Sequence, residues 1–295
     1  GCVHIAPGHG MEDYLLVLDH NAKASVGERL EILAPVDNGG KFTAAVPEFV
    51  GQHVFKANPK IVERLKENGR LLGHGSLNHS YPHCWRCKQP VIFRATEQWF
   101  VSMETNELRK EALAEIERVR WIPAYGRDRI NGMIENRPDW CLSRQRVWGT
   151  PIPGFTCVEC GKVLAHPRVI DHVADLIGQH GTDYWFANQA AALLPAGTQC
   201  EGCGGTEFEK ERDILDVWFE SGAMPYGQSH YPFENKERFE RGFPAHYIAE
   251  GLDQTRGWFY TLVVHATAIF DTIPFRNCVV NGLILAEDGR KMSKS

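Results

Sequence analysis

The sequence lacks a long hydrophobic run, an excess of positive charge and a leader segment. Its most apolar stretch, residues 257–270, is shorter than the about 20 residues that a membrane-spanning helix needs. Lysine and arginine total 32 against 37 acidic residues, a net charge of −5, which argues against a sequence-blind nucleic-acid-coating protein. No basic segment followed by an apolar one opens the chain, which argues against a secretory signal. We therefore expect no membrane partner and a cytoplasmic location.

The composition is that of a folded globular protein. The 295 residues can form two ordinary domains, and 43% hydrophobic with 23% charged residues excludes a disordered or fibrous chain. We find no internal repeat. The chain opens at Gly1 without an initiator, inside a motif-like stretch, so we expect it to be part of a longer protein.

Six of the nine cysteines fall into three Cys-x-x-Cys pairs. Two pairs are each followed by glycine, which lets backbone N–H groups face the thiolates, and four soft thiolates suit tetrahedral zinc. These four are Cys157, Cys160, Cys200 and Cys203. The long loop between the pairs is tolerable, because closure entropy grows only logarithmically with length. The alternatives are empty reduced knuckles or a redox pair.

The third pair, Cys84 and Cys87, has no partner pair in the sequence. Either His79 or His83 supplies further ligands, or the partner pair lies upstream of residue 1. We expect a metal here as well. The remaining cysteines are isolated and are expected to act as small buried hydrophobes. These are Cys2, Cys141 and Cys278.

Four stretches have helical patterns. Residues 12–20 follow a Gly/His-rich turn. Asn58 and Pro59 have the form of an N-cap and first helical position, so a helix is expected to begin there. Residues 106–119 place Leu and Ile on one stripe with charges opposite. Residues 253–270 form a helix with mixed faces.

Two stretches have strand patterns. Residues 91–101 alternate and carry β-formers, and residues 278–285 are apolar enough for a buried strand. The helix at 253–270 precedes this second strand, and strand–helix–strand order favours a parallel α/β sheet. Residues 151–215, broken by Gly and Pro, form the cysteine-bearing insertion.

The chain ends with Lys291-Met292-Ser293-Lys294-Ser295. Two lysines and two hydroxyls on a loop can hold a triphosphate and neutralise its charge as pyrophosphate leaves. Taken alone, the pentapeptide is equally compatible with a solvated basic tail. Its place after a buried strand favours the ligand site, because α/β sheets bind ligands at the carboxyl ends of their strands.

Longer motifs carry a family resemblance. The stretches are KMSKS at 291–295, DWCLSRQRVWGTPIP at 139–153, DVWFESG at 216–222 and EGLDQTRGWF at 250–259. Together they resemble class I aminoacyl-tRNA synthetases, and within that class the isoleucyl enzymes, over essentially the whole chain. Glu220 stands where the isoleucyl pattern has aspartate. The Arg144-Gln145-Arg146 run is expected to be structural or to face tRNA.

Residues 1–14, GCVHIAPGHGMEDY, are similar to a stretch of the family's editing domain, with Ile5 in place of threonine. The resemblance implies that Asp13 grips the α-amino group of a mischarged aminoacyl-tRNA and that His4 lies beside the same ester. Without the family, Asp13 is better explained as an acid in the first turn of a helix, where it favours the helix dipole.

The resemblance implies that isoleucine and ATP, with Mg²⁺, form isoleucyl-adenylate, and that the isoleucyl group then passes to tRNA(Ile). Catalysis is then positioning plus stabilisation of phosphate charge. Lys291 and Lys294 are the catalytic residues. Trp218 and Trp258 wall the amino-acid pocket, although either tryptophan taken alone is better explained by packing. The adenylate-binding residues are Glu250, Gly251, Asp253, Gln254, Lys291, Met292, Ser293 and Lys294.

We expect a second, hydrolytic editing step on energetic grounds. Isoleucine and valine differ by one methylene, which is worth only about 1–3 kcal/mol of discrimination, too little for faithful translation. We expect an α/β fold: the second half of a Rossmann-like nucleotide-binding domain with a zinc-bearing insertion, preceded by the end of the β-rich editing domain. The divisions are 1–78 for editing, 79–100 for a zinc-knuckle connection, 101–150 for the catalytic domain, 151–215 for the zinc insertion and 216–295 for the remaining catalytic domain. The full-length enzyme is expected to be a monomer.

The class's other signature, His-x-Gly-His, is not in these residues. We therefore expect the chain alone to be unable to activate isoleucine. Three alternatives are a valyl or leucyl sibling, a free-standing editing or zinc-binding tRNA module, and a redox protein. The tryptophan-bearing motifs disfavour the siblings, and the KMSKS loop disfavours the isolated module.

Overall fold

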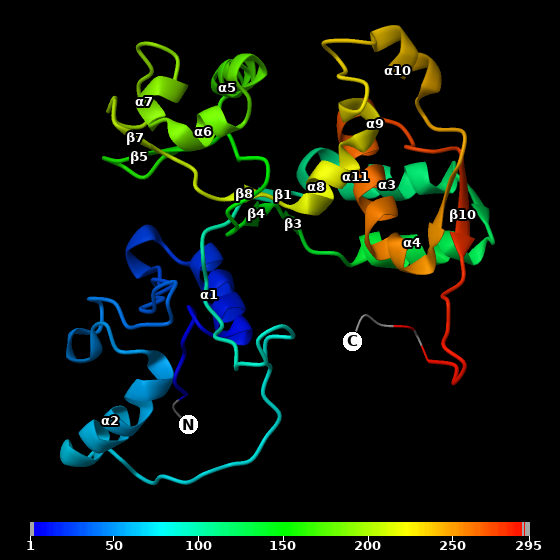
Figure 1. Ribbon diagram of the computed structural model, residues 1–295. Coiled ribbons are helices and arrows are strands. Elements are labelled where there is room, and N and C mark those ends of the chain that lie inside the picture. The colour runs from blue at the N-terminus through cyan, green and yellow to red at the C-terminus, as the bar shows by residue number, and fades with distance from the viewer. Residues whose placement is uncertain (1–2, 291, 293–295) are drawn as a thin grey trace. The chain divides into compact units, whose positions relative to one another are not determined.

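The computed structural model describes residues 3–290 and 292 and divides into two units, Gly1–Glu97 and Gln98–Ser295 (Figure 1). Cys2 and the expected phosphate-binding residues Lys291, Ser293 and Lys294 lie outside the described residues. Among the described residues, no helix combines the length and the apolar character needed to cross a membrane.

The first unit is built on two helices, α1 (Met11–Lys23) and α2 (Val54–Glu67). Short 3₁₀ turns, Val26–Glu28 and Pro47–Phe49, lie between them. Residues 3–97 contain isolated β-bridges, such as Val36 with Phe42, but no named strand. Helix α1 confirms the helix expected at 12–20, and it continues to Lys23.

The start expected for α2 was wrong. The helix begins at Val54, with His53 as its N-cap, and Pro59 lies inside it. The N–H groups of Lys56 and Ala57 both reach the His53 carbonyl, at 2.9 and 3.0 Å. Ala57 is completely buried, so its packing extends the helix by one turn ahead of the proline.

The second unit contains a parallel sheet of three strands, in the order β2 (Arg120–Ile122), β10 (Asn277–Asn281) and β9 (Ile248–Gly251). Strand β10 is parallel to both neighbours and pairs Asn281 with Gly251. The expected parallel α/β sheet is confirmed. Strand β10 ends at Asn281, earlier than the sequence pattern indicated.

Helices α3 (Leu108–Glu117), α4 (Tyr125–Glu135) and α11 (Trp258–Phe270) pack with this sheet around one core. The stripe expected at 106–119 is confirmed, because Leu108, Ala112 and Ile116 of α3 are buried. Helix α11 is buried from Phe259 to Thr267 and connects β9 to β10. The helix expected over 253–270 is interrupted: a 3₁₀ turn, Leu252–Arg256, comes first, and α11 begins after Gly257.

The cysteine-bearing insertion has a sheet and a core of its own. Its antiparallel strands are β6 (Val163–Leu164), β5 (Phe155–Cys157) and β7 (Phe208–Lys210), in that order. Helices α5 (Pro167–His180), α6 (Asp183–Ala187) and α7 (Ala190–Leu193) cover it. The completely buried rings of Phe155 and Trp185, with centroids 5.3 Å apart, lie at the centre of this core.

Short strands connect the insertion to the rest of the unit. They are β1 (Phe100–Val101) with β3 (Trp140–Cys141), and β4 (Ser143–Arg144) with β8 (Ile214–Leu215). Three short helices follow: α8 (Val217–Gly222), α9 (Met224–Gly227) and α10 (Lys236–Gly242). The strand expected at 91–101 was wrong except at Phe100–Val101, because the preceding backbone bonds loop segments such as Gly8 instead of a strand.

Candidate functional site

The carboxyl ends of β9 and β10 bring the two chemistry-bearing segments to one sheet edge. Val280 pairs with Glu250 and Asn281 with Gly251, so both strands end side by side. The chain leaves β10 toward the exposed Met292, and it leaves β9 into the turn that carries Asp253. Since ligands of parallel α/β sheets bind beyond this edge, Glu250, Gly251, Asp253 and Gln254 lie where such a site is expected.

Gly251 leaves room for the side chain of Asp253, two residues further on. A β-carbon at Gly251 would lie 2.6 Å from Oδ1 of Asp253, closer than any real contact of that kind. The Asp253 carboxylate therefore folds back over the end of β9. Glu250 and Asp253 are both exposed, so their carboxylate oxygens can accept hydrogen bonds from a ligand on the solvent side.

Gln254 is engaged within the protein. Its Oε1 accepts the backbone N–H of Trp258 at 3.0 Å, and its Nε2 lies 3.4 Å from Oδ2 of Asp253. The first bond satisfies one of the free N–H groups at the start of α11. Gln254 thus fixes the beginning of the helix that carries Trp258, and its predicted contact with the adenylate remains a prediction.

The two candidate pocket tryptophans come near each other through Gly257. A β-carbon on Gly257 would lie 3.1 Å from Cη2 of Trp218. Trp258 follows Gly257, and its indole N–H donates to the Ser221 carbonyl at 3.0 Å. Trp218 lines a cavity of about 540 Å³ with mixed polar and apolar walls, and Trp258 lines a separate, mainly apolar one of about 270 Å³. Their shared pocket remains a prediction.

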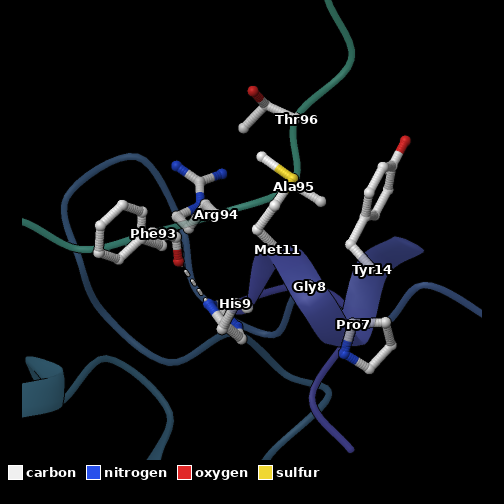
Figure 2. A pocket seen from close by; sticks show the side chains of 10 residues that line it. Pro7, Gly8, His9, Met11, Tyr14, Phe93, Arg94, Ala95 and Thr96 are labelled. Carbon is white, nitrogen blue, oxygen red and sulfur yellow. Dashed lines mark hydrogen bonds between the residues drawn. The ribbon is translucent and has the colours of Figure 1, made fainter. Parts of the chain in front are cut away.

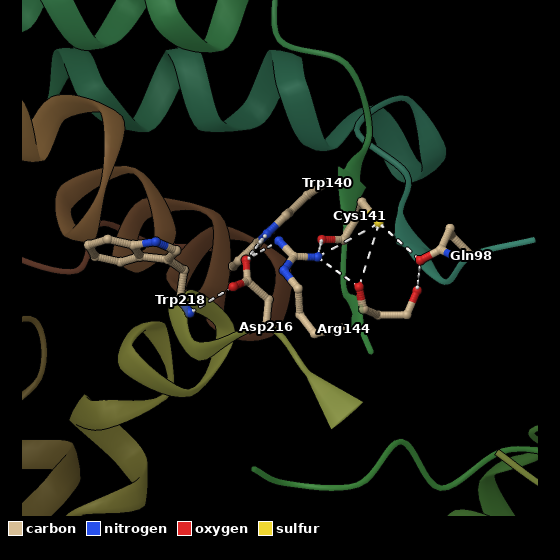
Figure 3. A network of polar contacts seen from close by, with 7 residues as sticks. Gln98, Trp140, Cys141, Arg144, Asp216 and Trp218 are labelled. Carbon is tan, nitrogen blue, oxygen red and sulfur yellow. Dashed lines mark hydrogen bonds and ion pairs between the residues drawn. The ribbon is translucent and has the colours of Figure 1, made fainter. Parts of the chain in front are cut away.

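A network that sequence reasoning missed holds the start of α8 (Figure 3). Asp216 is 4% exposed. Its Oδ2 accepts the Trp140 indole N–H and pairs with Nη2 of Arg144, both at 3.0 Å, and its Oδ1 accepts the Trp218 backbone N–H at 3.3 Å. The available signal was an aspartate placed immediately before a short helix, in the N-cap position.

Arg144 is structural, one of the two roles expected of its run. Its Nη1 donates to the carbonyls of Cys141 and Ser143, at 3.0 and 2.8 Å. Gln145 bonds Asp213 at 2.6 Å, whereas Arg146 is exposed. The guanidinium of Arg144 therefore joins β3 and β4 to the start of α8.

Glu220 forms a second connection to the same segment. Its Oε1 accepts the backbone N–H of Thr150 at 2.9 Å. The Thr150 carbonyl in turn accepts the N–H of Leu215 at 2.8 Å. The departure from the family pattern at position 220 thus places a carboxylate on the backbone that follows the exposed Trp148.

The four cysteines predicted from spacing converge. Sγ of Cys157 lies 3.6 Å from that of Cys203, Sγ of Cys160 lies 3.5 Å from that of Cys200, and all four atoms lie within 4.8 Å of one another. Four sulfurs at about 2.3 Å from a central tetrahedral zinc lie about 3.8 Å from each other. The donor set and its spacing therefore fit zinc.

Backbone geometry prepares these sulfurs for a cation. The N–H of Gly202 points at Sγ of Cys200, and the N–H of Gly205 points at Sγ of Cys203, each at 3.4 Å. N–H groups of Cys203 and Gly202 lower the pKa of Cys200 to about 6. Gly161, with φ 71°, closes the turn after the first pair, a conformation that glycine adopts without strain.

Cys84 and Cys87 adopt the same knuckle. The N–H of Cys84 donates to the Gln89 carbonyl and that of Lys88 to the Cys84 carbonyl, each at 2.8 Å, as in the other two pairs. Lys88, with φ 58°, occupies the glycine position. Across residues 3–290 and 292, however, only the four-cysteine group gathers three or more potential ligands, so neither His79 nor His83 completes a site here.

In the first unit, a cavity of about 240 Å³ lies between the turn after Pro7 and residues 93–96 (Figure 2). Nδ1 of His9 lies 2.8 Å from the Phe93 carbonyl, while Nε2 of His9 and Nε of Arg94 are buried without partners. The cavity walls thus carry two polar atoms that still require a partner.

The predicted editing residues do not line this cavity. His4 is exposed, and Oδ2 of Asp13 accepts the Ala6 N–H at 2.8 Å, which holds the turn before α1. Sequence reasoning assigned no role to His9 or Arg94, because residues 93–96 meet the turn only through the fold.

Comparison with known proteins identifies the class. Residues 18–295 match the family of class I tRNA synthetases that comprises the I, L, M and V enzymes, and the chain belongs to this family. It is similar over its whole length to proteins named isoleucine–tRNA ligase: 53% identical to that of Geobacter sulfurreducens, 50% to that of Persephonella marina and 47% to that of Thermotoga maritima. It spans about 30% of the length of these relatives.

Solved structures give weaker matches. The LeuRS–tRNA–LeuAMS complex of Agrobacterium radiobacter K84 matches 54% of this chain and 21% of its own, with 22% identity and a TM-score of 0.35. Mycobacterium tuberculosis methionyl-tRNA synthetase bound by methionyl-adenylate matches 72% and 31%, with 16% identity and a TM-score of 0.39. Both TM-scores are below 0.5, so the family assignment rests on the sequence comparisons.

Proposed function

We propose that this chain is part of an isoleucine–tRNA ligase, which joins isoleucine to tRNA(Ile) through isoleucyl-adenylate formed with ATP and Mg²⁺. One observation carries the proposal: relatives of that name are 45–53% identical over the whole chain. The arrangement of β9 and β10 supports it, because the two strands that precede the candidate nucleotide-binding residues end side by side at one sheet edge.

At this edge we assign the binding of the adenylate. The exposed carboxylates of Glu250 and Asp253 accept hydrogen bonds from ribose hydroxyls and nearby donors. Gly251 lets the Asp253 side chain fold back as observed. Lys291 and Lys294, with Met292 and Ser293, hold the phosphates, where ammonium groups stabilise the charge that develops as pyrophosphate leaves.

The amino-acid side chain is assigned to the neighbourhood of Trp218 and Trp258. Flat apolar rings suit a branched aliphatic side chain, and the Trp218 ring lies against Gly257, the residue that precedes Trp258. The backbone N–H groups of both tryptophans and the indole N–H of Trp258 donate hydrogen bonds to oxygens of Asp216, Gln254 and Ser221, which hold this wall. A fixed wall is what discrimination between similar aliphatic side chains requires.

We assign structural zinc to the four converging cysteines. When bound, the ion links the two knuckles of the insertion, and four thiolates leave no position for a reactive water. Cys84 and Cys87 supply half of a second site of the same knuckle geometry. Its other ligands would then come from outside this chain.

Residues 1–78 are assigned to the end of an editing domain that hydrolyses valyl-tRNA(Ile), with His4 and Asp13 as its candidates. Residues 79–100 connect it back to the catalytic domain. The catalytic segments are 101–150 and 216–295, and the zinc insertion is 151–215. A monomeric, cytoplasmic enzyme completes the proposal.

The test is amino-acid-dependent exchange of pyrophosphate into ATP by the full-length protein that carries this chain. Strong exchange with isoleucine and weaker exchange with valine is the expected result. Exchange that favours valine or leucine would reassign the substrate, and exchange with no amino acid would refute the activity. The 295-residue chain by itself should show no exchange, since it lacks the His-x-Gly-His signature.

A further inference from the structure

The starting point is a buried charge whose partners converge on one helix. Asp216 is 4% exposed, and each of its carboxylate oxygens is occupied. Oδ2 receives the Trp140 indole N–H and the Arg144 guanidinium, and Oδ1 receives the backbone N–H of Trp218. A carboxylate this deeply buried needs its counter-charge, because an unpaired buried ion is strongly destabilising.

Arg144 is fixed independently of Asp216. Its Nη1 donates to the carbonyls of Cys141 and Ser143, and its own backbone pairs with Ile214 across β4 and β8. The guanidinium is therefore held by two backbone carbonyls in addition to Asp216, whose Oδ2 it meets at 3.0 Å. Figure 3 shows the Arg144 fork between the strands and Asp216.

The same contacts set the orientation of the Trp218 ring. Asp216 caps α8 through the N–H of Trp218, so the carboxylate sets the first turn of the helix. The Trp218 ring then lies against Gly257, where Cη2 and Cζ3 come within 3.1 and 3.3 Å of a β-carbon position. A shift of the carboxylate therefore becomes a shift of the ring.

We propose that Asp216 and Arg144 form a positioning pair that sets where the Trp218 ring lies and thereby shapes the aliphatic amino-acid pocket. The pair acts through the backbone and ring of Trp218. This inference rests on the proposed function, and it adds the determinant of side-chain selectivity. Misplacement of a pocket wall by about 1 Å can reduce the rate by about 100-fold, so a remote pair can control it.

Two variants of the full-length protein test the pair. Asp216→Asn keeps an oxygen that can accept the Trp218 N–H. Its amide NH2 group, however, replaces the oxygen that accepts from Trp140 and Arg144, so that donor groups face one another. Arg144→Lys keeps the charge but loses the planar fork that reaches two carbonyls. We expect Asp216→Asn to lower kcat/KM for isoleucine about tenfold or more and to reduce the preference for isoleucine over valine, with KM for ATP unchanged. Arg144→Lys should give a smaller change of the same kind.

A matched control is available in the same unit. Arg109 also bonds a carboxylate, of Glu104 at 2.6 Å, and two carbonyls, of Ile134 and Arg137. Arg109→Lys should lower Tm comparably while leaving the isoleucine-to-valine ratio unchanged. Equal changes of that ratio in the Arg109 and Asp216 variants would overturn the positioning role and indicate a general loss of stability.

A second readout is independent of the activity. Tryptophan fluorinated at C6 gives a fluorine resonance for each ring, and Trp218→Phe identifies that of Trp218. Asp216→Asn should shift this resonance, while Arg109→Lys should not. An unchanged Trp218 resonance would refute the pair. If wild-type protein exchanges pyrophosphate with no amino acid, the proposed function fails, and the resonance still decides whether the pair positions the ring.

Discussion

Trp99 and Glu211 are separated by 112 positions in the chain but joined by a 2.7 Å hydrogen bond from the indole Nε1 to Oε2. The Glu211 N–H donates to the carbonyl of Gly154 at 2.8 Å. Strand β5 of the insertion begins directly after Gly154 and strand β7 ends directly before Glu211, so the Trp99 ring closes the base of this sheet.

Gly154→Ala should destabilise the second unit. Its new β-carbon would lie 2.5 Å from Cζ2 of Trp99, and forced overpacking of this kind costs about 1–3 kcal/mol. Urea unfolding of the protein measures the loss. The control is Gly178→Ala inside α5, where the added carbon meets nothing within 4 Å, and which should be neutral or stabilising by about 0.5–1 kcal/mol. Equal effects of both changes would contradict the contact.

Gly251→Ala should impair nucleotide binding in the full-length protein. The new β-carbon meets Oδ1 of Asp253 at 2.6 Å and must displace that carboxylate. We expect KM for ATP in pyrophosphate exchange to rise about tenfold, the effect of losing one charge-assisted hydrogen bond. Gly282→Ala, just after β10 and in open space, is the matched control and should leave KM unchanged. An unchanged KM in Gly251→Ala would remove Asp253 from the site.

Cys200→Ser should release zinc from the insertion. Hydroxyl oxygen replaces one of four thiolates, and a structural zinc site contributes directly to the folding of its module. Elemental analysis of purified protein should show a metal content lower by about one zinc per molecule. Cys141→Ser, which removes a half-buried thiol outside the cluster, serves as the control and should keep the metal. Zinc retained at full content in Cys200→Ser would argue against the assignment.

His265 should make stability fall in mild acid. The side chain is 4% exposed in α11 beside Tyr226, and desolvation lowers its pKa to about 4. An unfolded histidine titrates near 6.5, so the unfolded state binds the extra proton first as the pH falls. The free energy of unfolding is therefore unaffected by His265 above about pH 6.5. It falls as the pH drops toward 4, by about 3 kcal/mol.

Urea unfolding at pH 7 and at pH 4.5 tests this, read as the difference between wild type and His265→Gln. The variant should lose less stability between the two pH values, because it lacks the titrating group. His230→Gln, at an exposed histidine, should behave as wild type. The same pH dependence in wild type and His265→Gln would show that carboxylates alone cause the loss.

The features that the sequence determined are those with a local chemical signature. The spacing of the four cysteines predicted a common site, and they converge because each Cys-x-x-Cys turn folds from its own residues. The α3 stripe was likewise visible, since helical periodicity decides which side chains can share a face. The apolar stretch at 278–281 is a strand because it has no polar side chain to expose before Asn281.

The tertiary structure decided whatever depends on a partner distant in the chain. Pro59 favours a helix start, but the burial of Ala57 moved the start of α2 one turn earlier. Residues 91–99 have strand composition but form no strand, since their hydrogen bonds reach a turn near residue 8. The position of Asp216 between Arg144 and Trp218 has no local signature, because a buried charge is stable only where the fold supplies its counter-charge.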